Sequence, residues 1–226
     1  MSERVIVITG GHGALGSAVV RAALDQGCRV AIIDHASGQS APEGVLELGG
    51  VDLTQPAAAD TAMKAVADHY GGIDALLNIA GGFIWQTAER GDRANWNRLY
   101  SLNISTTLNA SLAALPWLRK SADGRIVNVG ANGALKAGAG MGAYAASKSG
   151  VHRLTESLAE ELKDSSVTVN AVLPSIIDTP QNRADMPDAD PAKWVQASDL
   201  ASVMLFLASP AARAVTGALV PVVGRV

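Results

Sequence analysis

Cysteine is nearly absent from this chain, in which Cys28 is the only one among 226 residues. One cysteine excludes an internal disulfide and fits a reducing compartment. The chain also lacks an apolar run of about 18 residues, the length that spans a membrane, and its start has no basic segment followed by an apolar one. We therefore expect a cytoplasmic protein with no membrane partner.

Positive charge is not in surplus either. Lysine and arginine number 18 and aspartate and glutamate 21, which gives a formal net charge of −3. This balance argues against nucleic acid as a partner. Hydrophobic residues make up 48 % and charged residues only 17 %, with 23 glycines, a composition that suits an α/β domain whose sheet is covered on both faces.

Short apolar runs alternate with helical patterns along the whole chain. Such runs are typical of buried parallel strands. The expected strands cover 5–8, 29–33, 45–51, 73–80, 125–131, 167–173 and 218–223, and the expected helices cover 18–26, 55–70, 101–118 and 198–208, with a further one that carries Tyr144. No repeat or linker interrupts the alternation, so residues 1–226 are predicted to form a single α/β domain.

The first expected strand ends in a glycine-rich turn at residues 9–16. A turn of this kind between a buried strand and a helix lets backbone N–H groups approach a pyrophosphate. The candidates for dinucleotide contacts in this turn are Gly10, Gly13, Ala14, Leu15 and Gly16. A tight turn without a ligand is the alternative.

Asp34 ends the second expected strand. A carboxylate at this place of a dinucleotide fold accepts hydrogen bonds from ribose hydroxyls and repels a 2′-phosphate, so NAD(H) is favoured and NADP(H) is kept as the alternative. His12 or His35 would soften this preference. Residues 35–44 are too few for a full crossover helix, so we expect an abbreviated loop there.

The next two strands also end in small or polar residues. Asp52 and Leu53 follow the third strand, where the carboxylate would meet an adenine amine. Asn78, Ala80 and Gly81 end the fourth strand and would lie close to the adenosine. A scaffolding amide that ties neighbouring loops together is the alternative for Asn78.

Tyr144 and Lys148 stand four residues apart in a segment with a helical pattern. Residues at this spacing share a helix face. A cation beside a phenol favours the phenolate and lowers the tyrosine pKa, which would make Tyr144 a general acid or base. An accidental pair on a solvated helix face is the alternative.

Taken together, these residues resemble the short-chain dehydrogenase/reductase family over nearly the whole chain. The landmarks that carry the resemblance are the glycine turn, Asp34, Asp52-Leu53, Asn78 to Gly81, Asn103, Tyr144 with Lys148, and Pro174 with Thr179. The resemblance implies a Rossmann-like doubly wound parallel sheet of about seven strands. It also implies that Tyr144 transfers the proton and contacts the cofactor, that Lys148 holds the nicotinamide ribose, and that Asn103 anchors a proton-relay water.

Further along, the resemblance implies contacts of Pro174 and Thr179 with the nicotinamide and a homodimer or homotetramer as the assembly. Ala14 departs from the family pattern, which has its middle glycine there. Ala131 departs more seriously, because the family carries a catalytic serine at this place. Asn132 is the candidate replacement for that hydroxyl.

The same loss of the serine occurs in the dihydropteridine reductase subgroup, which several stretches resemble. These stretches are 11–16, 80–83, 130–131, 173–174, 178–183 and 186–190. The resemblance implies NADH-dependent reduction of a quinonoid dihydropterin, a conjugated imine in which no single carbonyl oxygen needs a serine. Other planar imine or quinone-like acceptors remain alternatives.

Aromatic side chains near the carboxyl end of the sheet are candidates for substrate contacts. Phe83 and Trp85 follow the glycines of the fourth strand, and Trp194 ends a polar segment at 181–194 that we interpret as a mobile lid. Ala131 and Asn132 complete this set. His152 is expected on the surface, and no metal site is expected.

Three functions follow from this reading. The first is an NADH-dependent reductase of a planar C=N acceptor, with a small molecule as substrate and Tyr144 as proton donor. The second is a general ketone or alcohol oxidoreductase that uses Asn132. The third is a non-catalytic module that senses NAD(H).

Overall fold

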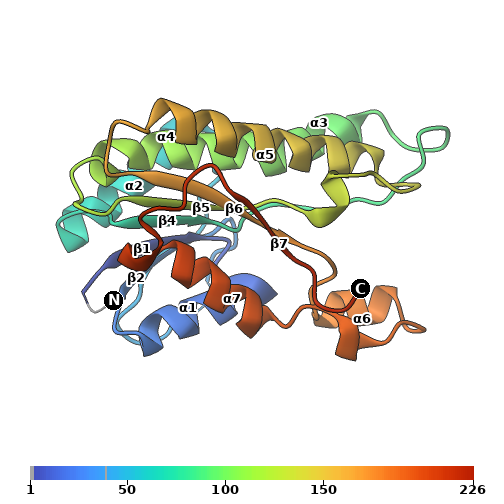
Figure 1. Ribbon diagram of the computed structural model, residues 1–226, viewed down its shortest axis with the longest axis horizontal. Helices are drawn as coiled ribbons and strands as arrows, with labels where there is room; N and C mark the ends of the chain where they lie inside the picture. The colour runs from blue at the N-terminus through green and yellow to red at the C-terminus, as the bar shows by residue number, and fades with distance from the viewer. Residues whose placement is uncertain (1–2, 39) are drawn as a thin grey trace.

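Seven parallel strands form one sheet in the computed structural model, which describes residues 3–38 and 40–226 (Figure 1). The strand order is β3-β2-β1-β4-β5-β6-β7, and every pair is parallel. The strands are β1 Val5–Thr9, β2 Arg29–Ile33, β3 Leu46–Leu48, β4 Ala75–Asn78, β5 Arg125–Val129, β6 Thr168–Pro174 and β7 Leu219–Val222. The predicted Rossmann-like fold is confirmed.

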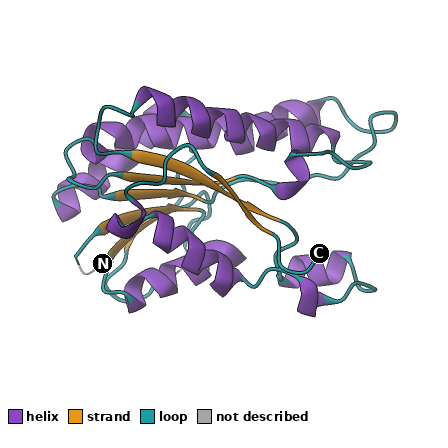
Figure 2. Ribbon diagram, viewed as in Figure 1, coloured by secondary structure: helices purple, strands orange, loops and turns teal. Residues whose placement is uncertain are grey.

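Helices cover both faces of this sheet (Figure 2). The α-helices are α1 Ala14–Asp25, α2 Pro56–Tyr70, α3 Ala94–Tyr100, α4 Thr106–Leu118, α5 Gly142–Glu161, α6 Pro180–Asp185 and α7 Ala197–Leu207. Helices α1 and α7 pack together below the sheet as drawn in Figure 1, whereas α2, α4 and α5 lie above it.

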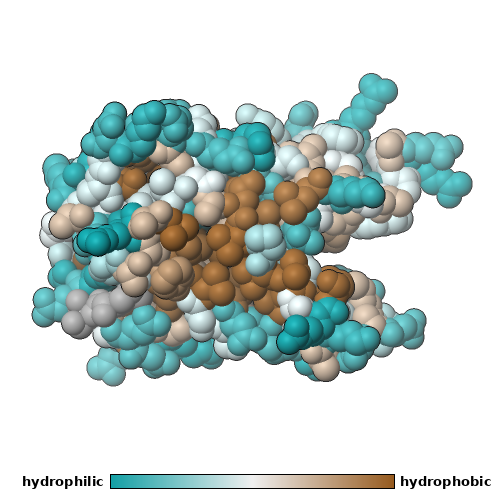
Figure 3. Space-filling view, in the orientation of Figure 1, coloured by the Kyte–Doolittle hydropathy of each residue, from teal (hydrophilic) through white to brown (hydrophobic). Residues whose placement is uncertain are grey.

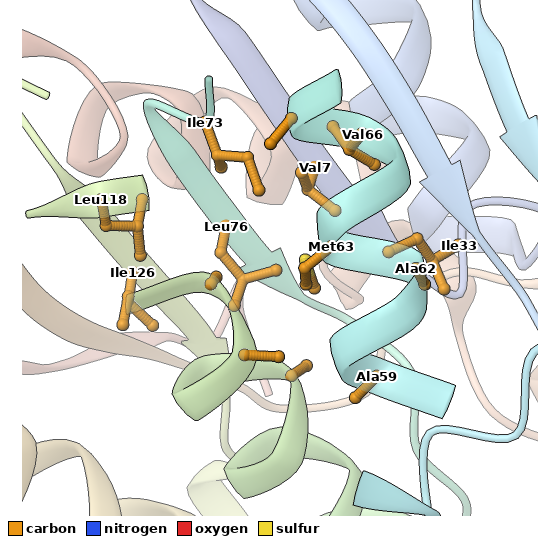
Figure 4. Close-up of a cluster of buried hydrophobic side chains, with 14 of the residues drawn as sticks. Val7, Ile33, Ala59, Ala62, Met63, Val66, Ile73, Leu76, Leu118 and Ile126 are labelled. Carbon is orange, nitrogen blue, oxygen red and sulfur yellow. The ribbon is translucent and has the colours of Figure 1, made fainter. Parts of the chain in front are cut away.

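The central strand β1 shows why both faces must be covered. Side chains alternate across a strand. Val5 and Val7 therefore enter the core that includes side chains of α2 and α4, where Figure 4 shows Val7. Ile6 and Ile8 enter the core that includes side chains of α1 and α7. All four side chains are buried, which explains the continuous apolar run in the sequence.

The side of the sheet to which successive strands are added changes at β1. Strands β2 and β3 lie on one side of β1, and β4 to β7 lie on the other. Ligands of open α/β sheets bind outside the carboxyl ends of the strands at such a switch point. Figure 3 shows a notch on the side to which these ends point, between the loops next to α3 and the segment that contains α6.

Some element boundaries differ from those expected. Helix α1 begins at Ala14, not at residue 18, because the turn residues Ala14 to Gly16 themselves form its first turn. The helix expected over 101–118 ends at Leu118 as predicted, with Pro116 inside it, but α4 itself begins at Thr106 because residues 101–105 are π-helical. The lid segment contains the short helix α6, whose Thr179 cap accepts a hydrogen bond from Asn182 N–H at 3.1 Å.

The link between β2 and β3 has no helix in its described residues, as the sequence predicted. Strand β3 is shorter than expected, with only Leu46–Leu48 paired to β2. Within the described ranges, no helix is both long and apolar enough to cross a membrane.

Candidate active site

The turn between β1 and α1 is built around two glycines that leave no room for a side chain. Gly10 has a φ of +69°, and a Cβ there would lie 3.0 Å from the backbone of Ala80. A Cβ on Gly16 would lie 2.1 Å from the Gly10 carbonyl oxygen. Thr9 Oγ1 joins this turn to the next one by accepting hydrogen bonds from Ile79 N–H and Ala80 N–H at 3.0 and 3.1 Å.

These two turns border a cleft of about 600 Å³. The predicted cofactor residues that line it are Gly10, Gly13, Ala14, Leu15, Gly16, Asp34, Asp52, Leu53, Ala80 and Gly81. The glycine cradle and the N-terminus of α1 fit a dinucleotide, because unobstructed backbone N–H groups and the helix dipole attract a pyrophosphate. The residues present therefore fit the cofactor that the fold implies.

Six further described residues line this cleft and were not predicted. They are Ile33, Val51, Thr54, Ile79, Leu102 and Thr106, and His35, which the sequence placed near the cofactor, also lines it. Leu102 and Thr106 lie one turn apart beside Asn103, so the helix face next to that residue was the available signal. The others are neighbours of predicted residues at strand ends.

Asp34 lines the cleft with its carboxylate already held by the backbone. Oδ2 accepts a hydrogen bond from His12 N–H at 3.1 Å, and Oδ1 accepts one from Ala36 N–H at 3.0 Å. The His12 ring lies 3.0 Å from Glu47 Oε1, so Glu47 compensates any positive charge on His12. Each Asp34 oxygen keeps acceptor capacity toward the cleft.

Asp52 is also fixed at the cleft. Thr54 donates to its Oδ1 from the hydroxyl at 2.7 Å and from the backbone N–H at 2.9 Å. These hydrogen bonds lower the pKa of Asp52, so the side chain is an acceptor at neutral pH.

Asn78 has the scaffolding environment that the sequence left as an alternative. Its Nδ2 donates to Ser111 Oγ at 3.0 Å and to Asn128 Oδ1 at 2.9 Å. Asn128 Nδ2 in turn donates to Thr155 Oγ1 at 2.9 Å, so this buried network joins β4, β5 and α5. Asn78 is not among the residues that line the cleft.

Tyr144 and Lys148 lie in the first turns of α5, where the spacing predicted them. Lys148 is buried, and its Nζ donates a hydrogen bond to the Val129 carbonyl at the end of β5, at 2.8 Å. A Cβ on Gly81 would lie 3.4 Å from this Nζ, so Lys148 reaches the wall of the nucleotide cleft. The Phe83 and Tyr144 rings are nearly perpendicular, with an interplanar angle of 78° and centroids 4.9 Å apart.

The pKa of Tyr144 shifts in the direction opposite to that expected from a neighbouring cation. Burial raises the pKa of Tyr144 to about 12, and burial lowers the pKa of Lys148 to about 8. The expectation considered the charge of Lys148 alone, whereas desolvation disfavours both charged forms. The phenol is therefore protonated at neutral pH, as a proton donor must be.

Asn103 lies in a π-helical segment, Ser101–Ser105, inserted between α3 and α4. Its Nδ2 donates to Gly82 O at 3.0 Å and to Ser147 Oγ at 2.9 Å, and its Oδ1 accepts from Gly82 N–H at 2.9 Å. Asn103 thus joins the turn after β4 to the helix of Tyr144. Single π-helical turns often occur at functional sites.

His152 is buried, which corrects the expectation of a surface residue. Its Nε2 accepts a hydrogen bond from Ala131 N–H at 3.2 Å. Ala145 on the same helix is buried as well. The contact between His152 and Ala131 joins α5 to the turn that follows β5.

Ala131 and Asn132 follow β5 at the carboxyl end of the sheet. Ala131 is buried and offers no hydroxyl. Asn132 is half-buried, and its side-chain amide makes no hydrogen bond with the described part of the chain. Asn132 is thus the side chain next to Ala131 that has free donors.

The three aromatic candidates for substrate contacts differ in their exposure to solvent. Phe83 and Trp85 are 56 % and 60 % exposed, and Trp85 Nε1 donates to Ala139 O at 3.2 Å. Trp194 is only 5 % exposed, so its ring does not present a free face to a ligand. Phe83 and Trp85 therefore remain the aromatic candidates for substrate contacts.

Backbone hydrogen bonds join the residues that precede the lid segment to the residue that follows it. Asp178 N–H donates to Val195 O at 2.8 Å, and Val195 N–H donates to Ile176 O at 2.9 Å. Pro174 ends β6 and Thr179 caps α6, so both stand where the chain passes from the sheet into this segment. Neither lines the 600 Å³ cleft. Across residues 3–38 and 40–226, no cluster of His, Cys, Asp or Glu could hold a metal ion.

Known proteins resemble this chain over nearly its full length. Residues 4–190 match the family model described as short chain dehydrogenase. The 3-oxoacyl-acyl-carrier-protein reductase FabG of Vibrio cholerae is 30 % identical over 96 % of this chain and 94 % of its own. The 2-(S)-hydroxypropyl-CoM dehydrogenase 3 of Xanthobacter autotrophicus is 31 % identical over 99 % of this chain and 96 % of its own.

A solved structure shares both the fold and part of the sequence. The 3-ketoacyl-(acyl-carrier-protein) reductase from Brucella melitensis, complexed with NADH, matches 99 % of this chain and 98 % of its own with a TM-score of 0.88 and 25 % identity. Proteins of this family use NAD(P)(H). From its sequence match and its fold, the chain belongs to the short-chain dehydrogenase/reductase family of oxidoreductases.

Proposed function

We propose that the protein is an NADH-dependent reductase of a planar C=N acceptor such as a quinonoid dihydropterin. The observation that carries this proposal is the pairing of the protonated Tyr144 phenol with Phe83, beside a strand end that carries Ala131 in place of a hydroxyl donor. The exposed ring of Phe83 offers a face on which a flat heterocycle would stack.

The roles of the side chains follow from their chemistry. The reduced nicotinamide supplies a hydride when it is bound. Tyr144 donates its Oη proton to the acceptor nitrogen, which becomes an N–H group. Lys148 lies on the same helix face, and its pKa of about 8 leaves it largely protonated at pH 7, so its ammonium would stabilise the phenolate until Tyr144 regains a proton from solvent.

A ketone or alcohol oxidoreductase is the second candidate, and a specific observation favours it. The relatives named above are an oxoacyl reductase and a hydroxypropyl dehydrogenase. A carbonyl oxygen needs a hydrogen-bond donor as its charge develops. The free amide of Asn132 would supply that donor. Homo-oligomeric assembly and a cytoplasmic location stay predictions.

Steady-state oxidation of NADH with a panel of acceptors separates these functions. We expect turnover with a chemically generated quinonoid dihydropterin and lower kcat/KM with ketones and simple imines. Reduction of ketones but not of the pterin would replace the first candidate by the second. NADH binding without turnover of any acceptor would favour the sensing module.

Asp34 is expected to make NADH the tighter-binding cofactor. Its carboxylate repels a 2′-phosphate, and the nearby His12 ring lies 3.0 Å from Glu47 Oε1. Fluorescence titration should show at least tenfold weaker binding of NADPH than of NADH. In Asp34→Asn the difference should shrink, because the amide removes the negative charge and keeps the size. Tighter NADPH binding by the unaltered protein would reject this role.

A further inference from the structure

His152 belongs to a set of α5 side chains that hold the end of β5. Lys148 Nζ donates to Val129 O, Asn128 Nδ2 donates to Thr155 Oγ1, and Ala131 N–H donates to His152 Nε2. Two of these contacts bind residues of β5 itself, Asn128 and Val129. The contact of His152 binds Ala131, which lies in the turn that follows the strand.

That turn is held by α5 at both of its ends. The 3-10 turn Asn132–Ala134 begins directly after Ala131, whose N–H is bound to His152. At the other end, Ser149 Oγ donates to the Ala134 carbonyl at 2.9 Å. Asn132 lies between these two anchors with an unbonded side-chain amide.

The His152 imidazole occupies the space next to Gly130, which has no side chain. A Cβ on Gly130 would lie 2.5 Å from His152 Nε2, so a residue with a side chain at 130 would displace the ring. The imidazole thus fits directly over the backbone that leads into the turn.

The histidine is neutral in this environment. Burial, with the positive charges of Arg153 and Lys148 as smaller causes, lowers the pKa of His152 to about 4. At neutral pH its Nε2 therefore carries a lone pair, and the proton of the ring is on Nδ1. The Ala131 N–H then has a partner instead of being buried unpaired, which would be costly.

We propose that His152 is a positioning residue that, by accepting the Ala131 N–H, holds the turn at 131–134 so that the Asn132 amide contacts the substrate. The inference rests on the second candidate function, the reduction of a ketone. A carbonyl oxygen needs a hydrogen-bond donor, Ala131 offers none, and the inference assigns that role to Asn132. His152 itself touches neither substrate nor cofactor.

The first test compares His152→Leu, which lacks an acceptor, with His152→Gln, whose Oε1 lies about as far along the side chain as Nε2. The acceptor is the ketone of the panel that is reduced with the highest kcat/KM. We expect His152→Leu to lower kcat/KM about tenfold or more, and His152→Gln to remain within about threefold of the unaltered enzyme. The NADH Kd from fluorescence titration should not change in either variant.

A double-mutant cycle then asks whether the effect passes through Asn132. Asn132→Ala alone should lower kcat/KM, and adding His152→Leu to it should cost less than about a further twofold. Thr155→Val serves as the matched control, because it breaks another α5 contact with β5 away from the turn. It should lower the Tm without raising KM.

A long-range ¹H–¹⁵N spectrum of the histidines tests the contact without any turnover. The Nδ1–H tautomer with a bare Nε2 is expected for His152 at pH 7. An imidazolium or an Nε2–H tautomer would overturn the proposal even if no acceptor is reduced. So would fully additive losses in the cycle or an Asn132→Ala variant with unchanged kcat/KM. Failure of the whole panel would refute only the proposed function.

Discussion

Tyr144→Phe should lower kcat at pH 7 by about 10²–10⁴-fold, the range that a positioned general acid contributes. The substitution removes one oxygen and leaves the ring to pack against Phe83, whose centroid lies 4.9 Å away. The Tyr144 hydroxyl makes no hydrogen bond with the described residues, so its loss leaves no orphaned partner. Stopped-flow and steady-state NADH oxidation would measure the effect.

Cofactor binding provides the control for this variant. Tyr144→Phe should bind NADH with an affinity close to that of the unaltered protein and should keep its Tm. Unchanged turnover in the variant would remove Tyr144 from the chemistry and would favour the sensing module. A lost affinity for NADH would instead assign the hydroxyl to cofactor binding.

The pH dependence gives a second readout of the same residue. Because burial raises the pKa of Tyr144 to about 12, the phenol keeps its proton between pH 6 and 9. The acid form is the active form in reduction, so the rate of reduction should not fall in this range through ionisation of Tyr144. A fall with an apparent pKa near 7 that disappears in Tyr144→Phe would contradict the assignment.

Local features of the sequence were sufficient to predict the β1 to α1 turn and the Tyr144–Lys148 pair. Buried strands appear as continuous apolar runs, and glycines mark the turns that follow them. The four-residue spacing of Tyr144 and Lys148 places both on one face of any helix. Such signals depend only on residues that are close in the sequence, so they can be recognised without knowledge of the tertiary contacts.

Features that depend on distant residues were not predicted. His152 has no apolar signature, and its burial requires the absent side chain of Gly130 on another element. Asn103 has poor helix propensity, which does not reveal the π-helical turn around it or its hydrogen bonds with the distant Gly82 and Ser147. The direction of the Tyr144 pKa shift likewise depends on burial, which spacing does not reveal.

Gly16→Ala should weaken NADH binding at least tenfold and lower the Tm by several degrees. The new Cβ would lie 2.1 Å from Gly10 O and 2.8 Å from Gly11 Cα, and neither backbone atom can rotate away. The turn must therefore shift, at about the 1–3 kcal/mol typical of overpacking. For a chain of this size, that is about 2–4 °C in Tm per kcal/mol.

Two other glycines provide matched controls for this variant. Gly72→Ala adds the same methyl group where no atom lies within 4 Å, and it should change neither the Tm nor the NADH affinity. Gly13→Ala makes only an ordinary contact of 3.4 Å with Gly10 O, so it should keep the fold. It tests separately whether a methyl group at the cleft obstructs the pyrophosphate. Normal NADH affinity in Gly16→Ala would mean that this turn does not carry the dinucleotide, because the shift of Gly10 and Gly11 would otherwise move the N–H groups that bind it.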